Sequence, residues 1–143
     1  MEIISVKKRV TEDELKIDGR TFKLKKYDPL MGNYIITKLF TFTLPFGISD
    51  MIKGQVKGTE NLPSSNTNAP TMSKAEFLDL QRDILSNCYE LLPGDEAPVI
   101  RENGTYGISN FTSKIAIQLL IASLAFNFTD FFDAFQSIEE EGQ

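Results

Sequence analysis

The chain contains no histidine and only one cysteine, and these absences remove several classes of chemistry. Without histidine, a serine or cysteine triad of the usual kind cannot be built. A single cysteine, Cys88, cannot form a disulfide within the chain or a cysteine-based zinc site. The Gly-x4-Gly-Lys-Ser/Thr pattern of a phosphate-binding loop is missing too. We therefore expect a protein that is not an enzyme and that holds no metal or cofactor.

Long apolar runs are also missing. The most apolar stretch, residues 115–126, is shorter than the roughly 20 residues of a membrane helix and contains Gln118 and Ser123. The first residues, MEIISVKKRV, lack the apolar core preceded by positive charge that a cleaved signal peptide requires. These features predict a cytosolic protein that makes no membrane contact.

The composition is that of one ordinary globular domain over residues 1–143, with 41% hydrophobic and 24% charged residues. The net charge of -5 is unevenly distributed along it. Residues 1–57 hold 11 Lys and Arg against 7 Asp and Glu, whereas residues 58–143 hold 4 against 13. Such a split can drive head-to-tail association of copies, or can reflect two solvated surfaces that happen to differ.

The first half of the chain predicts a short β-hairpin followed by a helix. Apolar and polar residues alternate over 14–25 on both sides of Asp18-Gly19, a dipeptide typical of hairpin turns. Asp28 and Pro29 then have the pattern of a helix N-cap and first helical residue. Residues 58–71, GTENLPSSNTNAPT, have little to bury and predict a mobile loop between two halves of the domain.

The second half predicts further helices. Ser73 and Glu76 form a capping box, and apolar residues follow at helical spacing until Pro93-Gly94. Residues 98–108, with Asn103-Gly104 between apolar residues, predict a second hairpin. With the C-terminal helices described next, these patterns predict an α+β fold that is mostly α, with about four helices after the first hairpin.

The C-terminal region predicts two helices. A helix over about 111–126 is apolar on nearly every side and should be central to the fold. Asn127 and Thr129 are expected to break it, and Asp130 to favour a new helix start. The final helix would place an apolar stripe on one side, formed by Phe128, Phe131, Phe132, Phe135 and Ile138. This stripe either closes the core or binds a partner.

One basic cluster suggests a different partner. Its cations lie near the aromatic residues Phe22 and Tyr27, and this combination can bind single-stranded nucleic acid. The cluster consists of Lys7, Lys8, Arg9, Lys23, Lys25 and Lys26. Phe22 is predicted to face the core, however, and a pI near 4.8 disfavours nucleic acid as the partner. A nucleic-acid-binding regulator is kept as an alternative.

The segment Ala125 to Phe135, AFNFTDFFDAF, resembles the C-terminal signature of tail assembly chaperones from long-tailed phages and prophages of Gram-positive bacteria. Three other segments are similar to parts of the same family: GRTFKLK at 19–25, FLDLQ at 77–81 and NGTYGI at 103–108. The resemblance covers most of the chain after the first residues, and the phenylalanine segment is its distinctive part.

This resemblance implies a role in virion assembly. Such chaperones coat the long, hydrophobic tape measure protein, keep it soluble and help recruit tail tube subunits. They act in the host bacterial cytoplasm and are absent from the mature virion. The resemblance therefore implies tape measure and tail tube proteins as partners, while many copies on one filament would gain from contacts within a homo-oligomer. A structural tail component, such as a tube or completion protein, is the alternative.

Overall fold

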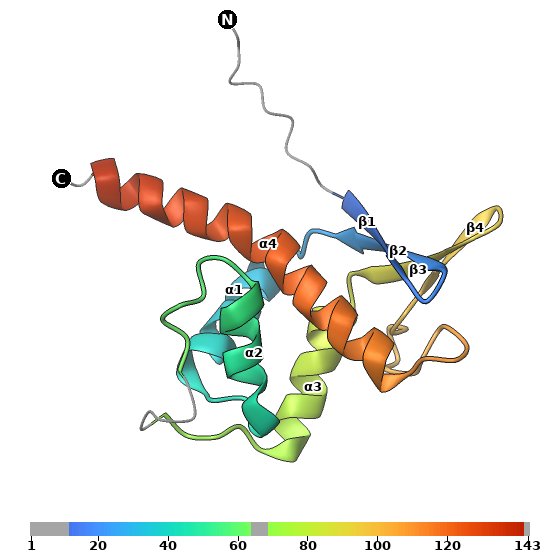
Figure 1. Ribbon diagram of the computed structural model, residues 1–143, viewed down its shortest axis with the longest axis horizontal. Coiled ribbons are helices and arrows are strands. Elements are labelled where there is room, and N and C mark those ends of the chain that lie inside the picture. The colour runs from blue at the N-terminus through green and yellow to red at the C-terminus, as the bar shows by residue number, and fades with distance from the viewer. Residues whose placement is uncertain (1–11, 64–68, 142–143) are drawn as a thin grey trace, which may run out of the picture.

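The computed structural model describes residues 12–63 and 69–141, except for the side chains of Phe46 and of residues 129–141. Within these ranges, four α-helices and a four-stranded antiparallel sheet make up the fold (Figure 1). The elements in chain order are β1 (Glu12–Ile17), β2 (Arg20–Lys25), α1 (Pro29–Thr41), a 3-10 helix (Pro45–Gly47), α2 (Ile48–Gln55), α3 (Lys74–Leu85), β3 (Cys88–Leu92), β4 (Asp95–Pro98) and α4 (Ser113–Glu141).

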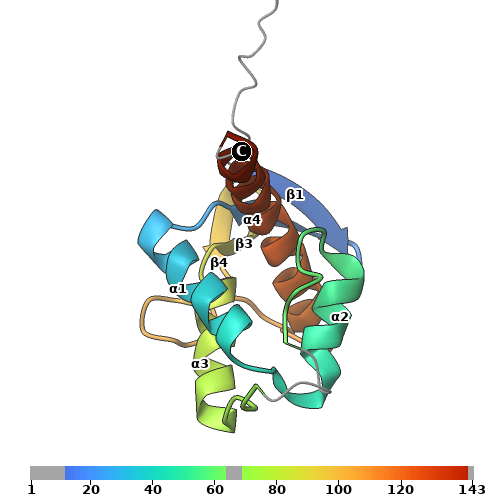
Figure 2. The same cartoon turned by 90° about the vertical axis from the view of Figure 1, so that its left-hand side faces the viewer.

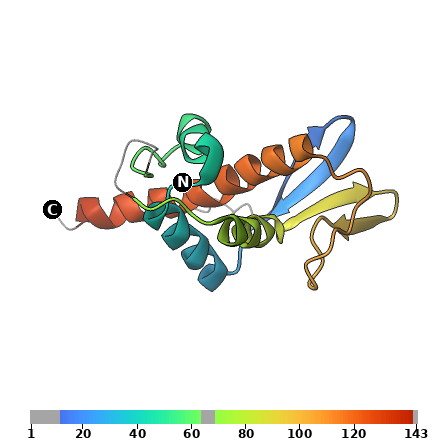
Figure 3. The same ribbon diagram turned by 90° about the horizontal axis from the view of Figure 1, so that it is seen from below.

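Helix α4 connects the two ends of the molecule. The sheet lies at one end and α1 and α2 lie toward the other, while α4 crosses both (Figures 1 and 3). Viewed toward its C-terminal end, α4 has that end uppermost and descends between α1 and α2 (Figure 2). Its N-terminal half supplies Ile115, Leu119, Leu120 and Leu124 to the core, each no more than 2% exposed. The predicted central position of this helix is confirmed.

The N-terminal hairpin is confirmed. Asp18 and Gly19 have φ of 52° and 77°, the left-handed conformation that a two-residue turn of this kind needs. The turn pairs Leu15 with Phe22 and Ile17 with Arg20. Phe22 is completely buried, so this hairpin supplies one layer of the core beneath α4.

The sheet contains a second hairpin, formed by β3 and β4, that the sequence did not predict. Helix α3 ends at Leu85, and Cys88–Leu92 is a strand rather than the end of that helix. Cys88 and Glu90 are buried while the residues between and after them are more exposed, which is the two-residue period of a strand. Gly94, with φ of 75°, turns the chain into β4. After β4 the chain turns back over 99–107, where Ile100 and Tyr106 form an isolated antiparallel bridge and the Gly107 N–H donates to the Val99 carbonyl at 3.0 Å. The predicted hairpin at 98–108 is thus reduced to this bridged turn.

The expectation of a mostly α fold is therefore wrong. Strands β2 and β3 pair antiparallel, with Phe22 opposite Glu90 and Leu24 opposite Cys88. This pairing joins the two hairpins into one sheet with the strand order β1-β2-β3-β4. The fold is α+β, with the sheet and the helices as comparable parts.

The two predicted helix starts are confirmed by their hydrogen bonds. The Asp28 carboxylate accepts from the backbone N–H groups of Leu30 and Met31, at 3.1 and 3.3 Å. The Ser73 hydroxyl accepts from the Glu76 N–H at 3.2 Å and donates to the Glu76 carboxylate at 3.0 Å. Each contact satisfies N–H groups that the first turn of a helix leaves unpaired.

A partly buried ion pair holds the segment that leads into α4. Arg20 donates to both carboxylate oxygens of Glu90, at 2.7 and 2.8 Å, and Glu90 is only 7% exposed. The same guanidinium donates to the carbonyls of Ser109 and Asn110, at 2.8 and 2.9 Å. These bonds to Arg20 lower the pKa of Glu90. Arg20 thereby joins β2, β3 and the segment that leads into α4.

Both ends of the predicted loop 58–71 are held by the fold. Leu62 is 3% exposed, and the buried Thr59 hydroxyl donates to the Val56 carbonyl at 2.6 Å. At the other end, the Thr43 N–H donates to the Pro70 carbonyl at 2.9 Å. Residues 64–68 lie outside the described part of the chain, so the predicted mobility stays a prediction.

Candidate functional site

The C-terminal region is one helix rather than two. Helix α4 runs without a break through Asn127 and Thr129, so the expected break and new start at Asp130 are wrong. The Asn127 amide donates to the Ser123 carbonyl one turn earlier, at 3.0 Å. Its carbonyl oxygen accepts from the Tyr27 N–H at 2.9 Å. The amide N–H and the carbonyl oxygen of Asn127 thus both have partners while α4 stays helical. The side chain therefore does not draw the backbone into a non-helical turn.

A buried polar cluster holds the middle of α4 against the rest of the fold. The Tyr27 hydroxyl lies 2.9 Å from the Ser123 hydroxyl and 3.1 Å from the Ile84 carbonyl. Ser123, which is completely buried, donates to the Asn87 side chain at 2.9 Å. Burial raises the pKa of Tyr27, so its hydroxyl remains protonated. The cluster connects α4 with α3 and with the segment after β2.

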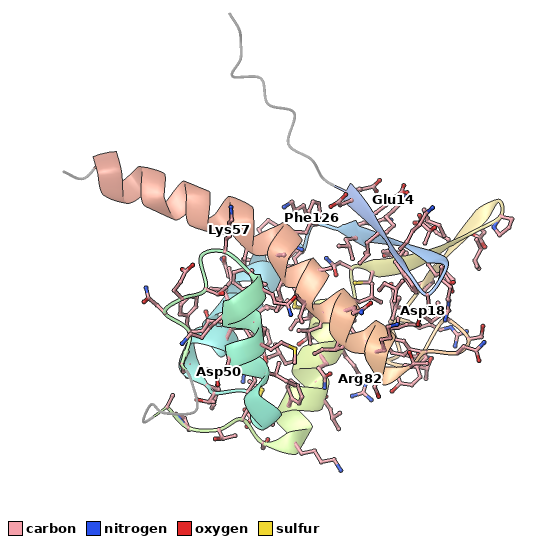
Figure 4. The ribbon with its side chains drawn as sticks, viewed as in Figure 1. Glu14, Asp18, Asp50, Lys57, Arg82 and Phe126 are labelled. Carbon is pink, nitrogen blue, oxygen red and sulfur yellow. The ribbon has the colours of Figure 1, made fainter. Side chains whose placement is uncertain are left out.

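Lys26 adds a further anchor at the point where α4 leaves the body. Its ammonium group donates to the Phe126 carbonyl and lies 3.9 Å from the centre of the Phe126 ring. The Phe126 side chain extends from α4 near the end of β2 (Figure 4). Lys26 and Tyr27 thus hold α4 at Phe126 and Asn127, two consecutive positions.

Phe128 belongs to the core. Its side chain is 1% exposed and lies in the same buried cluster as Leu124 and Ile35. In this conformation it is not available to a partner. The other four residues of the predicted stripe are in the helical backbone of α4, and their side chains lie outside the described part of the structure: Phe131, Phe132, Phe135 and Ile138.

The last turns of α4 project beyond the body. Residues 129–141 extend past α1 and α2 in Figures 1 and 3, over a length of about 20 Å at 1.5 Å per residue. Positions 131, 132 and 135 continue the row of helical positions occupied by Leu120, Leu124 and Phe128 in the core. The buried face of α4 is therefore continued, in sequence register, along a segment that leaves the fold.

The lysines after the first turn are engaged within the fold. Lys23 and Lys25 both donate to Glu96, at 3.0 and 2.9 Å. Phe22, which would have to stack on a base, is completely buried. Lys7, Lys8 and Arg9 lie outside the described residues.

Potential metal ligands do not cluster in the described residues. No group of three or more His, Cys, Asp or Glu side chains is placed to hold a metal ion in 12–63 and 69–128. Cys88 is completely buried and lies on β3. Burial raises the pKa of its thiol to about 12, so it is not a nucleophile at neutral pH.

Sequence reasoning missed the residues that anchor α4. No motif contains the four anchoring residues Lys26, Tyr27, Asn87 and Ser123, and they meet only because β2, β3 and α4 pack together.

The described part of the chain contains no helix long and apolar enough to span a membrane. Comparison of the chain with protein-family models, with curated proteins and with solved structures gives no match.

Proposed function

We propose that this protein is a phage tail assembly chaperone that coats the tape measure protein and helps to recruit tail tube subunits. The observation that carries the proposal is the projecting end of α4. Its residues 129–135 belong to the segment that resembles the family signature, and positions 131, 132 and 135 continue the row of core positions of α4. The helix extends past α1 and α2 (Figure 1). A projecting helix with apolar positions on one side suits docking against a helical, hydrophobic filament.

The proposed site consists of four residues, Phe131, Phe132, Phe135 and Ile138. Phe128 is buried in the core, so we assign it no direct contact with the tape measure protein. The chaperone would act in the host bacterial cytoplasm and leave before the virion is complete. Neighbouring copies on the filament would gain from contacts with one another. The charge difference between residues 1–57 and 58–143 is partly neutralised within the fold, where Arg20 pairs with Glu90 and Lys23 with Glu96.

A variant test separates binding from folding. Phe131→Asp combined with Phe135→Asp places two charges on the proposed stripe and should abolish copurification with the tape measure protein. Thr129→Asp combined with Ser137→Asp is the matched control, because the helical period places these positions on the opposite side of α4. Thermal unfolding of the purified variants checks that both are folded. Equal loss of binding in both variants would count against the stripe.

The alternative of a structural tail component makes a different prediction. Mass spectrometry of purified virions should find no copies of this protein if it is a chaperone, and many copies if it is a tube or completion protein. The nucleic-acid alternative predicts salt-dependent binding that requires the basic cluster.

A further inference from the structure

A small pocket lies between the first turns of α1 and the middle of α4, where α4 leaves the body. This α1 pocket has a volume of about 140 Å³, and residues of both helices line it: Pro29, Gly32, Ile35, Ile36, Asn127 and Phe128. It is smaller than small-molecule sites, which begin at roughly 300 Å³. An apolar cavity of about 150 Å³ holds one benzene ring. The α1 pocket therefore has the size of a single phenylalanine side chain.

Gly32 leaves this pocket open, although the fold does not require a glycine there. Its φ is not in the left-handed region, and a Cβ at this position would meet only the Tyr27 Cβ, at an ordinary 3.7 Å. Alanine would fit and would favour the helix, since glycine weakens a helix interior. Leu30, in the same turn of α1, is 77% exposed. The glycine is explained by the room it leaves for a side chain from outside.

A basic cavity adjoins the α1 pocket. It has a volume of about 280 Å³, shares Tyr27 and Asp28 with the α1 pocket and is also lined by Lys25 and Lys26. Asp28 is the acidic residue among its described lining, and the Asp28 carboxylate already caps α1. Lys25 also pairs with Glu96. The two cavities together favour a segment that carries an aromatic side chain followed by carboxylates.

The end of α4 has this sequence. Its apolar positions follow the four-three spacing of a coiled-coil seam: Leu124, Phe128, Phe131, Phe135 and Ile138. Residues 139–141 are all glutamate, and no lysine or arginine occurs after Lys114. The projecting turns are shorter than the three to four heptads, roughly, that sustain a coiled coil. A partner helix of this kind would therefore need a contact on the body as well.

A two-fold axis brings the end of α4 and the α1 pocket together. Position 135 lies seven residues after position 128, on the same side of α4 and about 10 Å further along it. When two copies cross antiparallel at positions 131 and 132, position 135 of each copy reaches position 128, and hence the α1 pocket, of the other. Position 139 follows one turn later, toward the basic cavity. In such a symmetric interface each contact forms twice.

We propose that the free protein is a dimer in which Phe135 of each copy fills the α1 pocket of the other. The dimer covers the phenylalanine stripe, which a monomer would leave beyond its fold, and large apolar patches rarely stay exposed on soluble proteins. The tape measure protein would then displace the partner copy to reach the stripe. The inference concerns the free protein and does not require the proposed function.

Sedimentation equilibrium of the purified protein tests the dimer. The wild type should have twice the 16.1 kDa mass of one chain and dissociate on dilution. Gly32→Leu fills the α1 pocket from within and should weaken the dimer at least about a hundredfold, because two phenyl rings lose their burial. Gly54→Leu is the matched control and should dimerise like the wild type. Gly54 is exposed in α2, on the other side of α4 from α1 (Figure 2), and a Cβ there would meet nothing within 4 Å.

A mixture of two defective variants tests whether the contact is reciprocal. Phe135→Ala removes the ring and should weaken the dimer as Gly32→Leu does. A heterodimer of these two variants keeps one open pocket facing one intact ring. It should therefore form at concentrations at which neither variant associates with itself.

Four results would refute the contact: a monomeric wild type, a Gly32→Leu dimer of wild-type strength, equal weakening in Gly54→Leu, or a mixture that associates no better than its components. Circular dichroism checks the folding of each variant. If Gly32→Leu does not fold, Phe135→Ala decides, and a dimer of wild-type strength then refutes the contact. All these measurements use the protein alone, so the proposed function stands or fails separately in the tape measure experiments.

Discussion

Asn127 provides a test in which the structure and local sequence reasoning predict opposite signs. Local sequence reasoning treats Asn127 as a helix breaker, so it predicts that Asn127→Ala makes the protein more stable. In the structure its side chain accepts from the Tyr27 N–H at 2.9 Å and donates to the Ser123 carbonyl at 3.0 Å. Asn127→Ala should therefore make the protein less stable.

The magnitude follows from two opposing contributions. Loss of the acceptor leaves the Tyr27 N–H without its partner against α4, which costs about 1–3 kcal/mol. Alanine is the better helix former by roughly 0.6 kcal/mol. The free energy of unfolding should therefore fall by about 0.4–2.4 kcal/mol.

Urea unfolding followed by circular dichroism measures this change. Asn33→Ala is the matched control, because Asn33 is exposed on α1 and its side chain makes no hydrogen bond within the described residues. The control should be neutral or slightly stabilising, since only helix propensity changes. If Asn127→Ala proves as stable as Asn33→Ala, α4 is not anchored through Tyr27 and our account of its position is wrong.

Three further predictions follow from single contacts. Glu90→Gln should lower stability by about 1–3 kcal/mol at neutral pH because it weakens the bonds from Arg20. Arg20 lowers the pKa of Glu90, so the stability that the ionised carboxylate contributes is fully present above its ordinary pKa of 4.5. This stability is lost as the pH falls through the lower pKa of the folded state. The difference in stability between wild type and Glu90→Gln should therefore shrink in thermal melts at acid pH. Ser73→Ala should cost about 1 kcal/mol in thermal unfolding through loss of the cap on α3. Cys88 should react with a thiol reagent only on unfolding, and rapid reaction of the native protein would contradict its burial.

Features specified by neighbouring residues could be predicted from the sequence. The Asp18-Gly19 turn, the Asp28 cap and the Ser73 capping box each depend on atoms within a few residues, and each is present. Cys88–Leu92 could not be assigned in this way, because its apolar spacing also fits a helix. Pairing of Cys88 with Leu24 across the sheet decides its conformation.

The same limit applies to the candidate sites. Asn127 continues the helix because of a partner, Tyr27, that is 100 residues away in the sequence. The apolar spacing of the last helix did predict a continuous stripe, but only packing against the body separates Phe128 from the positions that project beyond it.

The solubility of the tape measure protein tests the central claim most directly. This protein is coexpressed with the tape measure protein of the phage or prophage to which our proposal assigns it, and the tape measure protein in the soluble fraction is quantified with and without it. Our account predicts that the tape measure protein is largely insoluble alone and becomes soluble in a complex with this chain. An equal soluble fraction in both cases, with no complex recovered, would contradict the assignment as a tail assembly chaperone.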